Sequence, residues 1–140
     1  MIRTLIDAGP IIALFDRSDQ HHEKVLNFMK SYEGKLMSTW PVLTEVSYML
    51  DFHKETQLDF FDWVIQGGIE IHNIEQWQLR SIREKLNIYS DLPADLADSS
   101  LLEVAETVGL STIITLDKDF AVYRLQNGHG LKNLLDGILN

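Results

Sequence analysis

Residues 3–15 read RTLIDAGPIIALF, a short apolar run closed by an acid and followed by a turn and a second apolar run. We interpret Arg3–Ile6 as a β-strand that ends at Asp7, and the second apolar run as a short helix. The same arrangement returns late in the chain, where the strand-like stretch Thr112–Leu116 is followed by Asp117. Short strands that alternate with helical periods are typical of crossover units around a parallel sheet.

The rest of the chain continues this alternation. We expect strands at Lys35–Ser38 and Ile69–His72 and an edge strand around Val122–Leu125. No repeat, linker or shift of composition divides the chain, so residues 1–140 are expected to form one α/β domain. Helical periods, caps and turn residues predict helices up to about Phe15, over about residues 20–32, 41–52, 57–66 and 75–86, and between Pro93 and Gly109.

The overall composition is that of an ordinary globular protein, with 45% hydrophobic and 24% charged residues. The absence of cysteine excludes thiol nucleophiles, thiolate zinc sites, iron–sulfur clusters and disulfide scaffolds. No apolar run reaches the roughly 18 residues of a membrane span, and the apolar segment before Asp7 is too short for a signal peptide. We therefore expect a soluble, cytoplasmic protein that does not enter a membrane.

The formal net charge of −9 argues against a broad, nonspecific nucleic-acid surface, because such a surface needs a basic patch. It does not exclude a phosphate substrate, since bound divalent cations reverse the local sign of an acidic site. Most of the acids are expected to be solvated. Glu84 and Glu103, whose helical neighbours are polar, are interpreted as surface residues of this kind.

Four acids stand where the pattern predicts burial or a sheet edge. Asp7 and Asp117 each follow an apolar strand, at the edge where open α/β sheets bind ligands. Asp98 and Glu45 each fall within the apolar stripe of a predicted helix. Asp95 lies three residues before Asp98, in the first turn, where it either caps the helix or joins Asp98.

Four carboxylates in one cleft repel each other, and several must be protonated unless cations neutralise them. The residues thus predict a metal site whose ligands are all oxygens, which favours Mg²⁺ or Mn²⁺ over zinc or copper. Such ions promote in-line hydrolysis of a phosphodiester. In the alternative reading, Asp7 caps the following helix, Asp117 is a turn residue, Asp98 is an ordinary capping-region acid and Glu45 turns to solvent.

Four segments together resemble the motifs of the PIN-domain ribonucleases, in order and spacing, along nearly the whole chain. They are LID with Gly9-Pro10 (residues 5–10), TEV (44–46), DLADS (95–99) and TLDKDF (115–120). In style they are most similar to the VapC-like toxins of prokaryotic toxin–antitoxin pairs. Each motif alone is weak, whereas the four in order form a strong joint signal.

This resemblance implies a three-layer α/β/α fold with a central parallel sheet of about five strands. It implies a Mg²⁺- or Mn²⁺-dependent endoribonuclease that hydrolyses RNA, a cognate antitoxin protein that occludes the site, and a homodimer. Carried over position by position, the metal-binding and catalytic acids are Asp7, Glu45, Asp98 and Asp117, with Asp95 and Asp119 in support.

The first motif departs from the family in one respect. The family's first acid is commonly followed by a hydroxyl or amide residue, whereas Ala8 and Gly9 stand here, so only main-chain groups can replace that side chain. The hydroxyl of Thr115 is expected to fill part of the role. Lys118, which follows Asp117 directly, is the best candidate for a contact with RNA phosphate.

The predicted helix around residues 58–65 is apolar on most of its surface and is interrupted only by Asp59 and Asp62, which indicates core packing combined with a protein interface. Two other functions stay open. One is a haloacid-dehalogenase-like phosphatase, which needs a second acid two residues after the first, where Gly9 stands. The other is a PIN-like module that binds RNA or a protein without cleaving it.

Overall fold

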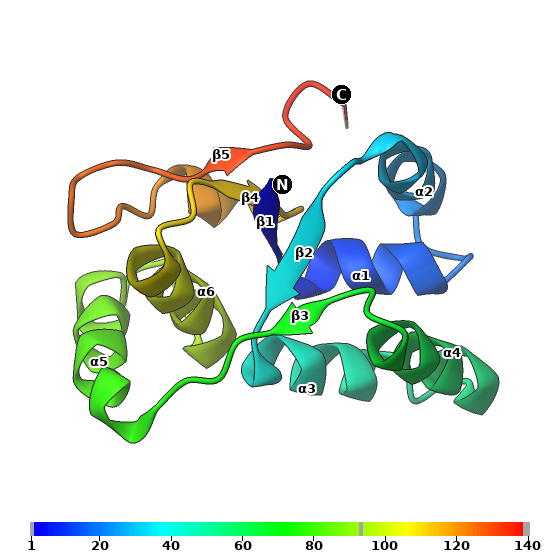
Figure 1. Ribbon diagram of the computed structural model, residues 1–140, viewed down its shortest axis with the longest axis horizontal. Helices are drawn as coiled ribbons and strands as arrows, with labels where there is room; N and C mark the ends of the chain where they lie inside the picture. The colour runs from blue at the N-terminus through cyan, green and yellow to red at the C-terminus, as the bar shows by residue number, and fades with distance from the viewer. Residues whose placement is uncertain (1, 93, 139–140) are drawn as a thin grey trace.

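In the computed structural model, which describes residues 2–92 and 94–138, a parallel five-stranded sheet forms the centre of the molecule (Figure 1). The strand order is β3-β2-β1-β4-β5, and every neighbouring pair is parallel. The α/β fold expected from the sequence is thereby confirmed. The strands are β1 (Arg3–Ile6), β2 (Lys35–Ser38), β3 (Glu70–Ile71), β4 (Thr112–Ile114) and β5 (Lys132–Asn133).

Helices cover both sides of this sheet. They are α1 (Ala8–Phe15), α2 (His22–Ser31), α3 (Trp40–Met49), α4 (Lys54–Ile65), α5 (Leu79–Ile88) and α6 (Leu96–Val108), with short 3₁₀ helices η1 (Gln76–Gln78) and η2 (Lys118–Ala121). In Figure 1, α5 and α6 lie to the left of the strands and α1, α2 and α4 to the right. Pro93, expected to open α6, lies outside the described residues. Over residues 2–92 and 94–138, no helix combines the length and apolar character needed to cross a bilayer.

The two central strands fix the edge on which the acids stand. Leu5 pairs with Ile113 and Ile6 with Ile114, and all four side chains are at most 1% exposed. Parallel strands covered by helices on both faces are apolar without alternation, and the C-terminal halves of β1 and β4 follow this rule. Because both strands end at a rigid, close-packed core, the residues that follow them are held in place.

The edge strand predicted around Val122–Leu125 is wrong. The chain there leaves the 3₁₀ helix η2, and the backbone N–H groups of Val122 and Tyr123 both donate to the carbonyl of Asp119 instead of to a strand. Tyr123 and Leu125 are buried and alternate with exposed neighbours, which produces a strand-like pattern in a turn. The strand at this edge of the sheet, beside β4, is β5, whose two residues carry no β-branched signal.

Glu103 was expected at the surface, and this expectation is also wrong. The side chain is 4% exposed and receives Lys85 Nζ at 3.2 Å and Gln78 Nε2 at 3.0 Å. Burial by itself raises the pKa of Glu103, but hydrogen bonds from Ser81, Gln78 and Lys85 outweigh it and hold the pKa below its usual value. The compensating charge comes from α5, so helical neighbours within α6 did not reveal it.

Candidate metal centre

The first acid of the site is positioned by β1 and α1 together. Asp7 extends the β1 ladder, since its backbone N–H donates to the carbonyl of Ile114 at 3.0 Å. It is also the N-cap of α1, where its Oδ1 accepts the N–H of Ala8 at 2.8 Å. The N–H of Ala8 is thus used by the cap of α1. The carboxylate is buried, with 8% of the residue exposed.

Thr115 joins Asp7 and Asp117, the two predicted acids that follow strands. Its hydroxyl donates to Asp7 Oδ2 at 2.9 Å and accepts the backbone N–H of Asp117 at 2.9 Å. Asp117 in turn is the N-cap of η2, where its Oδ1 accepts the N–H of Asp119 at 2.9 Å. A single buried hydroxyl therefore fixes the spacing of the two strand-end acids.

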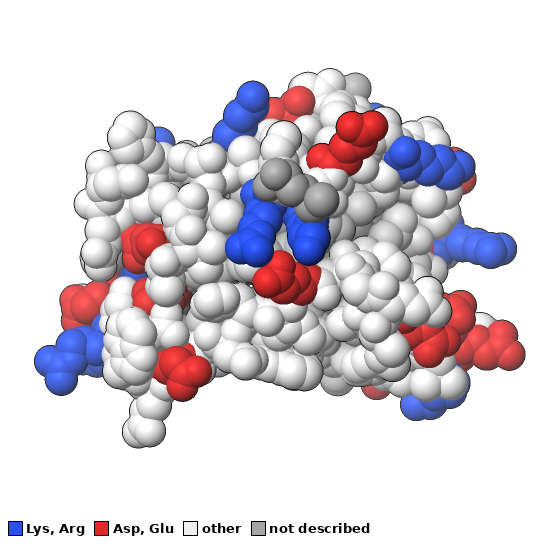
Figure 2. Space-filling model, viewed as in Figure 1, with Lys and Arg blue, Asp and Glu red and all other residues white. Residues whose placement is uncertain are grey.

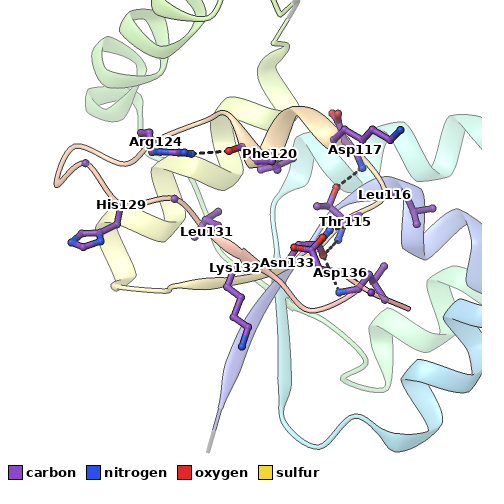
Figure 3. Close-up of a pocket in the computed structure, with 16 residues that line it drawn as sticks. Thr115, Leu116, Asp117, Phe120, Arg124, His129, Leu131, Lys132, Asn133 and Asp136 are labelled. Atoms are coloured by element: carbon purple, nitrogen blue, oxygen red, sulfur yellow. Dashed lines mark hydrogen bonds between the residues drawn. The ribbon is translucent and has the colours of Figure 1, made fainter. Parts of the chain in front are cut away.

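Asn133 of β5 holds Thr115 from the other side, as Figure 3 shows. Its Oδ1 accepts the N–H of Thr115 at 3.2 Å, and its Nδ2 donates to the Thr115 carbonyl at 2.9 Å. The side-chain amide thus takes the place of a backbone partner just beyond the end of β4. The sequence reasoning missed this residue, because an asparagine near the C-terminal end of a chain carries no local signal of such a role.

The third acid comes from the first turn of α6. Asp95 is the N-cap and its Oδ1 accepts the N–H of Asp98 at 2.8 Å, while Asp98 Oδ2 accepts the N–H of Asp95 at 3.2 Å. This reciprocal capping box makes Asp95 the residue that orients Asp98. Asp95 itself is exposed and Asp98 is half-buried.

Three of the predicted acids converge. One carboxylate oxygen from each of Asp7, Asp98 and Asp117 lies within 4.8 Å of the other two, a spacing that one cation can bridge. Glu45 is not in this set. It lies exposed on α3, close enough for its charge to act on Asp7. The predicted quartet is therefore a tight triplet with a fourth acid at its rim.

The triplet is electrostatically unfavourable without a counter-ion. Burial, with smaller contributions from the charges of Glu45 and Asp117, raises the pKa of Asp7 from its usual 3.8 to about 6, although hydrogen bonds from Ala8 and Thr115 oppose the rise. Burial is also the main cause that raises the pKa of Asp98, followed by the charges of Asp95 and Asp7.

At the rim, partial burial and the charges of Asp95 and Asp117 raise the pKa of Glu45. Each of these shifts disfavours the ionised form. A divalent cation at the centre of the triplet reverses that preference, and oxygen-only ligands fit Mg²⁺ or Mn²⁺.

A cleft of about 800 Å³ opens beside Asp117 and runs between η2, the following loop and β5. Three cationic side chains line it, Lys118, Arg124 and Lys132, together with His129 and the acids Asp117 and Asp136. The Arg124 guanidinium is held by two backbone carbonyls, and Figure 3 shows His129 and Lys132 directed away from Asp117. Lys118 is exposed and follows Asp117 directly in sequence, so it is the basic residue of the cleft that is nearest to the acids along the chain.

The comparisons with known proteins agree with this architecture. The sequence profile of the PIN domain family matches residues 4–125. No curated protein matches the chain. Among solved structures, Mycobacterium tuberculosis VapC20, described as a sarcin–ricin loop cleaving toxin, superposes with a TM-score of 0.78 at 15% identity, covering 85% of this chain and 93% of that one.

Two further structures are similar at lower scores. A toxin–antitoxin complex from Klebsiella pneumoniae has a TM-score of 0.60 at 21% identity, covering 84% of this chain and 90% of that one. VapBC2 from Rickettsia felis, bound to a DNA fragment from its promoter, has a TM-score of 0.61 at 15% identity, covering 95% and 98%. At these identities the likeness is one of fold.

Proposed function

Because this chain belongs to the PIN domain family, we propose that it is a Mg²⁺- or Mn²⁺-dependent endoribonuclease and the toxin of a toxin–antitoxin pair. The observation that carries the proposal is the convergence of Asp7, Asp98 and Asp117 at the carboxyl edge of the sheet. Structural and capping roles account for each acid singly, but they do not require three of them to share one pocket.

In this proposal Asp7, Asp98 and Asp117 hold the cation directly, and Glu45 contributes from the rim. Asp95 orients Asp98 through the capping box, and Asp119 supports Asp117 through its N–H. Thr115 keeps the two strand-end carboxylates in register. When bound, the cation supplies charge neutralisation at the scissile phosphate and lowers the pKa of the attacking water.

A protein partner is supported by an exposed apolar surface. A groove between α3 and α4 is lined by Trp40, Tyr48 and Phe61, which are 55%, 72% and 37% exposed. Figure 2 shows an uncharged stretch of surface over α3. Phe60 of α4 is fully buried, so this helix has the core side that the sequence predicted, and its outer side is free for an interface.

The similar solved structures extend the proposal to its partners. One is described as a sarcin–ricin loop cleaving toxin, and another as a toxin–antitoxin complex. We therefore assign this chain an RNA substrate and a cognate antitoxin that covers the acidic site. A cytoplasmic homodimer completes the proposal, and sedimentation of the purified chain tests its oligomeric state.

The direct test is RNA cleavage by the purified full chain. Total bacterial RNA incubated with the protein and Mg²⁺ or Mn²⁺ should yield discrete fragments, and excess EDTA should stop the reaction. Calcium, which prefers more ligands at longer distances, should support cleavage poorly. Binding of RNA without fragments in either metal would instead favour a non-catalytic PIN-like module.

Replacing Thr115 by valine should weaken cation binding. Valine has the same shape but removes the hydroxyl that bonds Asp7 and the N–H of Asp117, so the two carboxylates lose their fixed spacing. Loss of such a supporting group typically costs about 10–100-fold in metal affinity. Titration calorimetry with Mn²⁺ measures the change, and Thr115→Ser, which keeps the hydroxyl, is the matched control. Equal affinities for the valine and serine variants would contradict the assigned role.

Replacing Lys118 by alanine should weaken RNA binding and leave cation binding unchanged. An exposed lysine at the mouth of the site contributes one phosphate contact, so the slope of log affinity against log salt should fall by about one. Lys30→Ala, in the last turn of α2 and exposed, removes the same charge away from the cleft and serves as control. The assignment of Lys118 to RNA binding is refuted if the Lys118→Ala variant shows the same KM for RNA and the same salt slope as the Lys30→Ala variant.

A further inference from the structure

Arg124 carries a guanidinium group that is fixed in place at the cleft beside Asp117. Its Nη1 donates to the carbonyl of Ala121 at 2.8 Å and to the carbonyl of Tyr123 at 2.9 Å. Ala121 is the last residue of η2, so the guanidinium caps the C-terminal end of that helix. The backbone carbonyls therefore hold the charged group in one position at the cleft.

Two further residues adapt the chain to this position. A Cβ atom on residue 130 would stand 2.9 Å from Nη1 of Arg124, so Gly130 allows the guanidinium to lie against the loop. The backbone of Arg124 is held as well, because its N–H donates to the Tyr89 hydroxyl at 2.8 Å. The surrounding chain thus preorganises an arginine side chain that is exposed to solvent.

The guanidinium keeps donors that these contacts do not use. Arginine has five N–H donors, and both contacts come from Nη1, so the donors on Nε and Nη2 remain. Over residues 2–92 and 94–138, no carboxylate forms an ion pair with Arg124. In a chain with 21 acidic and 12 basic residues, an arginine that is positioned but not neutralised by an acid is suited to an anionic ligand.

The surroundings of Arg124 favour a phosphate as that ligand. Asp117 begins η2 and Arg124 caps its other end, as Figure 3 shows, so the guanidinium stands roughly 8 Å along the helix from the proposed metal centre. The same cleft also contains Lys118 and Lys132. Once Asp117 binds the proposed cation, Asp136 is the only other acid among the residues lining this cleft.

We propose that Arg124 binds an RNA phosphate that neighbours the scissile one, through paired hydrogen bonds from Nε and Nη2. The inference rests on the proposed function, and it assigns the cleft between η2 and β5 as the path of the RNA strand away from the metal centre. The planar fork of arginine matches two phosphate oxygens. Because Nη1 already anchors the side chain, little conformational freedom is lost when the phosphate binds.

Arg124→Lys separates the fork from the charge. Lysine keeps the positive charge but lacks the rigid pair of N–H donors. The probe is a fluorescent single-stranded oligoribonucleotide of mixed sequence, whose binding is measured by anisotropy in Ca²⁺, where little cleavage is expected. The Kd should rise by about 10-fold or more, because hydrogen bonds to a charged group are lost. The slope of log affinity against log salt should stay the same, whereas Arg124→Ala should lower it by about one.

Gly130→Ala tests the same contact without removing the arginine. The added Cβ displaces the guanidinium, so RNA affinity should fall while the salt slope is kept. Calorimetry should show unchanged Mn²⁺ affinity for this variant and for Arg124→Lys, because neither alters a carboxylate. In cleavage assays the loss should appear in KM, since a contact with a neighbouring phosphate binds substrate and transition state alike.

Arg83→Lys is the matched control. Arg83 lies on α5, its side chain is 78% exposed, and it is not among the residues that line the cleft. The same exchange at this position should therefore leave the affinity for the oligoribonucleotide and the KM unchanged.

The possible failures are distinguishable. If the wild-type chain cleaves RNA and Arg124→Lys binds the oligoribonucleotide as tightly as Arg83→Lys, the role of Arg124 fails and the proposed function stands. A lower thermal midpoint of Arg124→Lys with unchanged RNA affinity would likewise overturn the role, because the guanidinium would then be a helix cap alone. If the wild type binds the oligoribonucleotide through Arg124 but cleaves no RNA with Mg²⁺ or Mn²⁺, the nuclease function fails and the phosphate contact stands.

Discussion

Replacing Asp7 by asparagine should abolish RNA cleavage while making the cation-free protein more stable. Asparagine keeps the shape and an oxygen that accepts the N–H of Ala8, but it removes the negative charge and puts an NH₂ group where Oδ2 accepts the Thr115 hydroxyl. Loss of one preorganised electrostatic group at a reacting centre typically costs about 10²–10³-fold in rate. A quantitative cleavage assay under saturating Mg²⁺ measures this loss.

The gain in stability has the same origin. Holding Asp7 ionised at neutral pH is unfavourable, since its pKa stands at about 6 instead of 3.8, a difference of about 3 kcal/mol. Asparagine avoids this penalty but loses the hydrogen bond from Thr115, which is worth about 1 kcal/mol, so in EDTA at pH 7.5 the free energy of unfolding should rise by about 1–2 kcal/mol. Each kcal/mol corresponds to about 2–4 °C in thermal midpoint.

Asp59→Asn, an exposed change on α4, is the control and should alter neither cleavage nor stability. A variant at Asp7 that still cleaves RNA, or one that loses both activity and stability, would contradict the account. The second outcome would mark Asp7 as a helix cap and nothing more.

The dependence of stability on pH should change sign when the cation is added. Without cation, Asp7 has a higher pKa in the folded than in the unfolded protein, so its contribution to stability is fully present below about pH 4 and is lost as pH rises through about 6. The raised pKa values of Asp98 and Glu45 act in the same direction. In EDTA the thermal midpoint should therefore fall between about pH 5 and 8.

With the cation present, the same carboxylates must be deprotonated to bind it, so the affinity rises over this pH range. At a Mg²⁺ concentration of about 100 Kd the stabilisation amounts to about 2.7 kcal/mol. Thermal unfolding at several pH values, with Mg²⁺ and with EDTA, should give curves that diverge as pH rises. Parallel curves would show that the cation does not bind at these acids.

The sequence was sufficient to predict the strand-end part of the site. An apolar strand closed by an acid occurs at Asp7 and again at Asp117, and adjacent parallel strands bring such acids to one edge. Asp98 could also be predicted from the sequence, because it interrupts an apolar stripe on α6. These predictions depend on hydrophobic periodicity, which is a local property of the sequence, and on the geometry that all parallel sheets share.

Other parts depended on contacts that no local pattern records. Glu103 has polar helical neighbours, yet Lys85 of α5 turns it into a buried ion pair. Glu45 was placed by an apolar stripe of Val42, Met49 and Phe52. Val42 is buried, but Met49 and Phe52 are 50% and 63% exposed, so the stripe does not continue into the core and Glu45 stays at the rim. Asn133, which holds Thr115, lies in the two-residue strand β5, and only the pairing of β5 with β4 brings the two residues together.

The most direct measurement is the position of a bound cation in a crystal of the full chain grown or soaked with Mn²⁺. We expect an anomalous peak between Asp7, Asp98 and Asp117, with oxygen ligands at roughly 2.0–2.3 Å, near the distances that small hard cations adopt. Saturating Mn²⁺ without a peak at this position, or with a peak bound elsewhere while the three carboxylates remain unliganded, would contradict it.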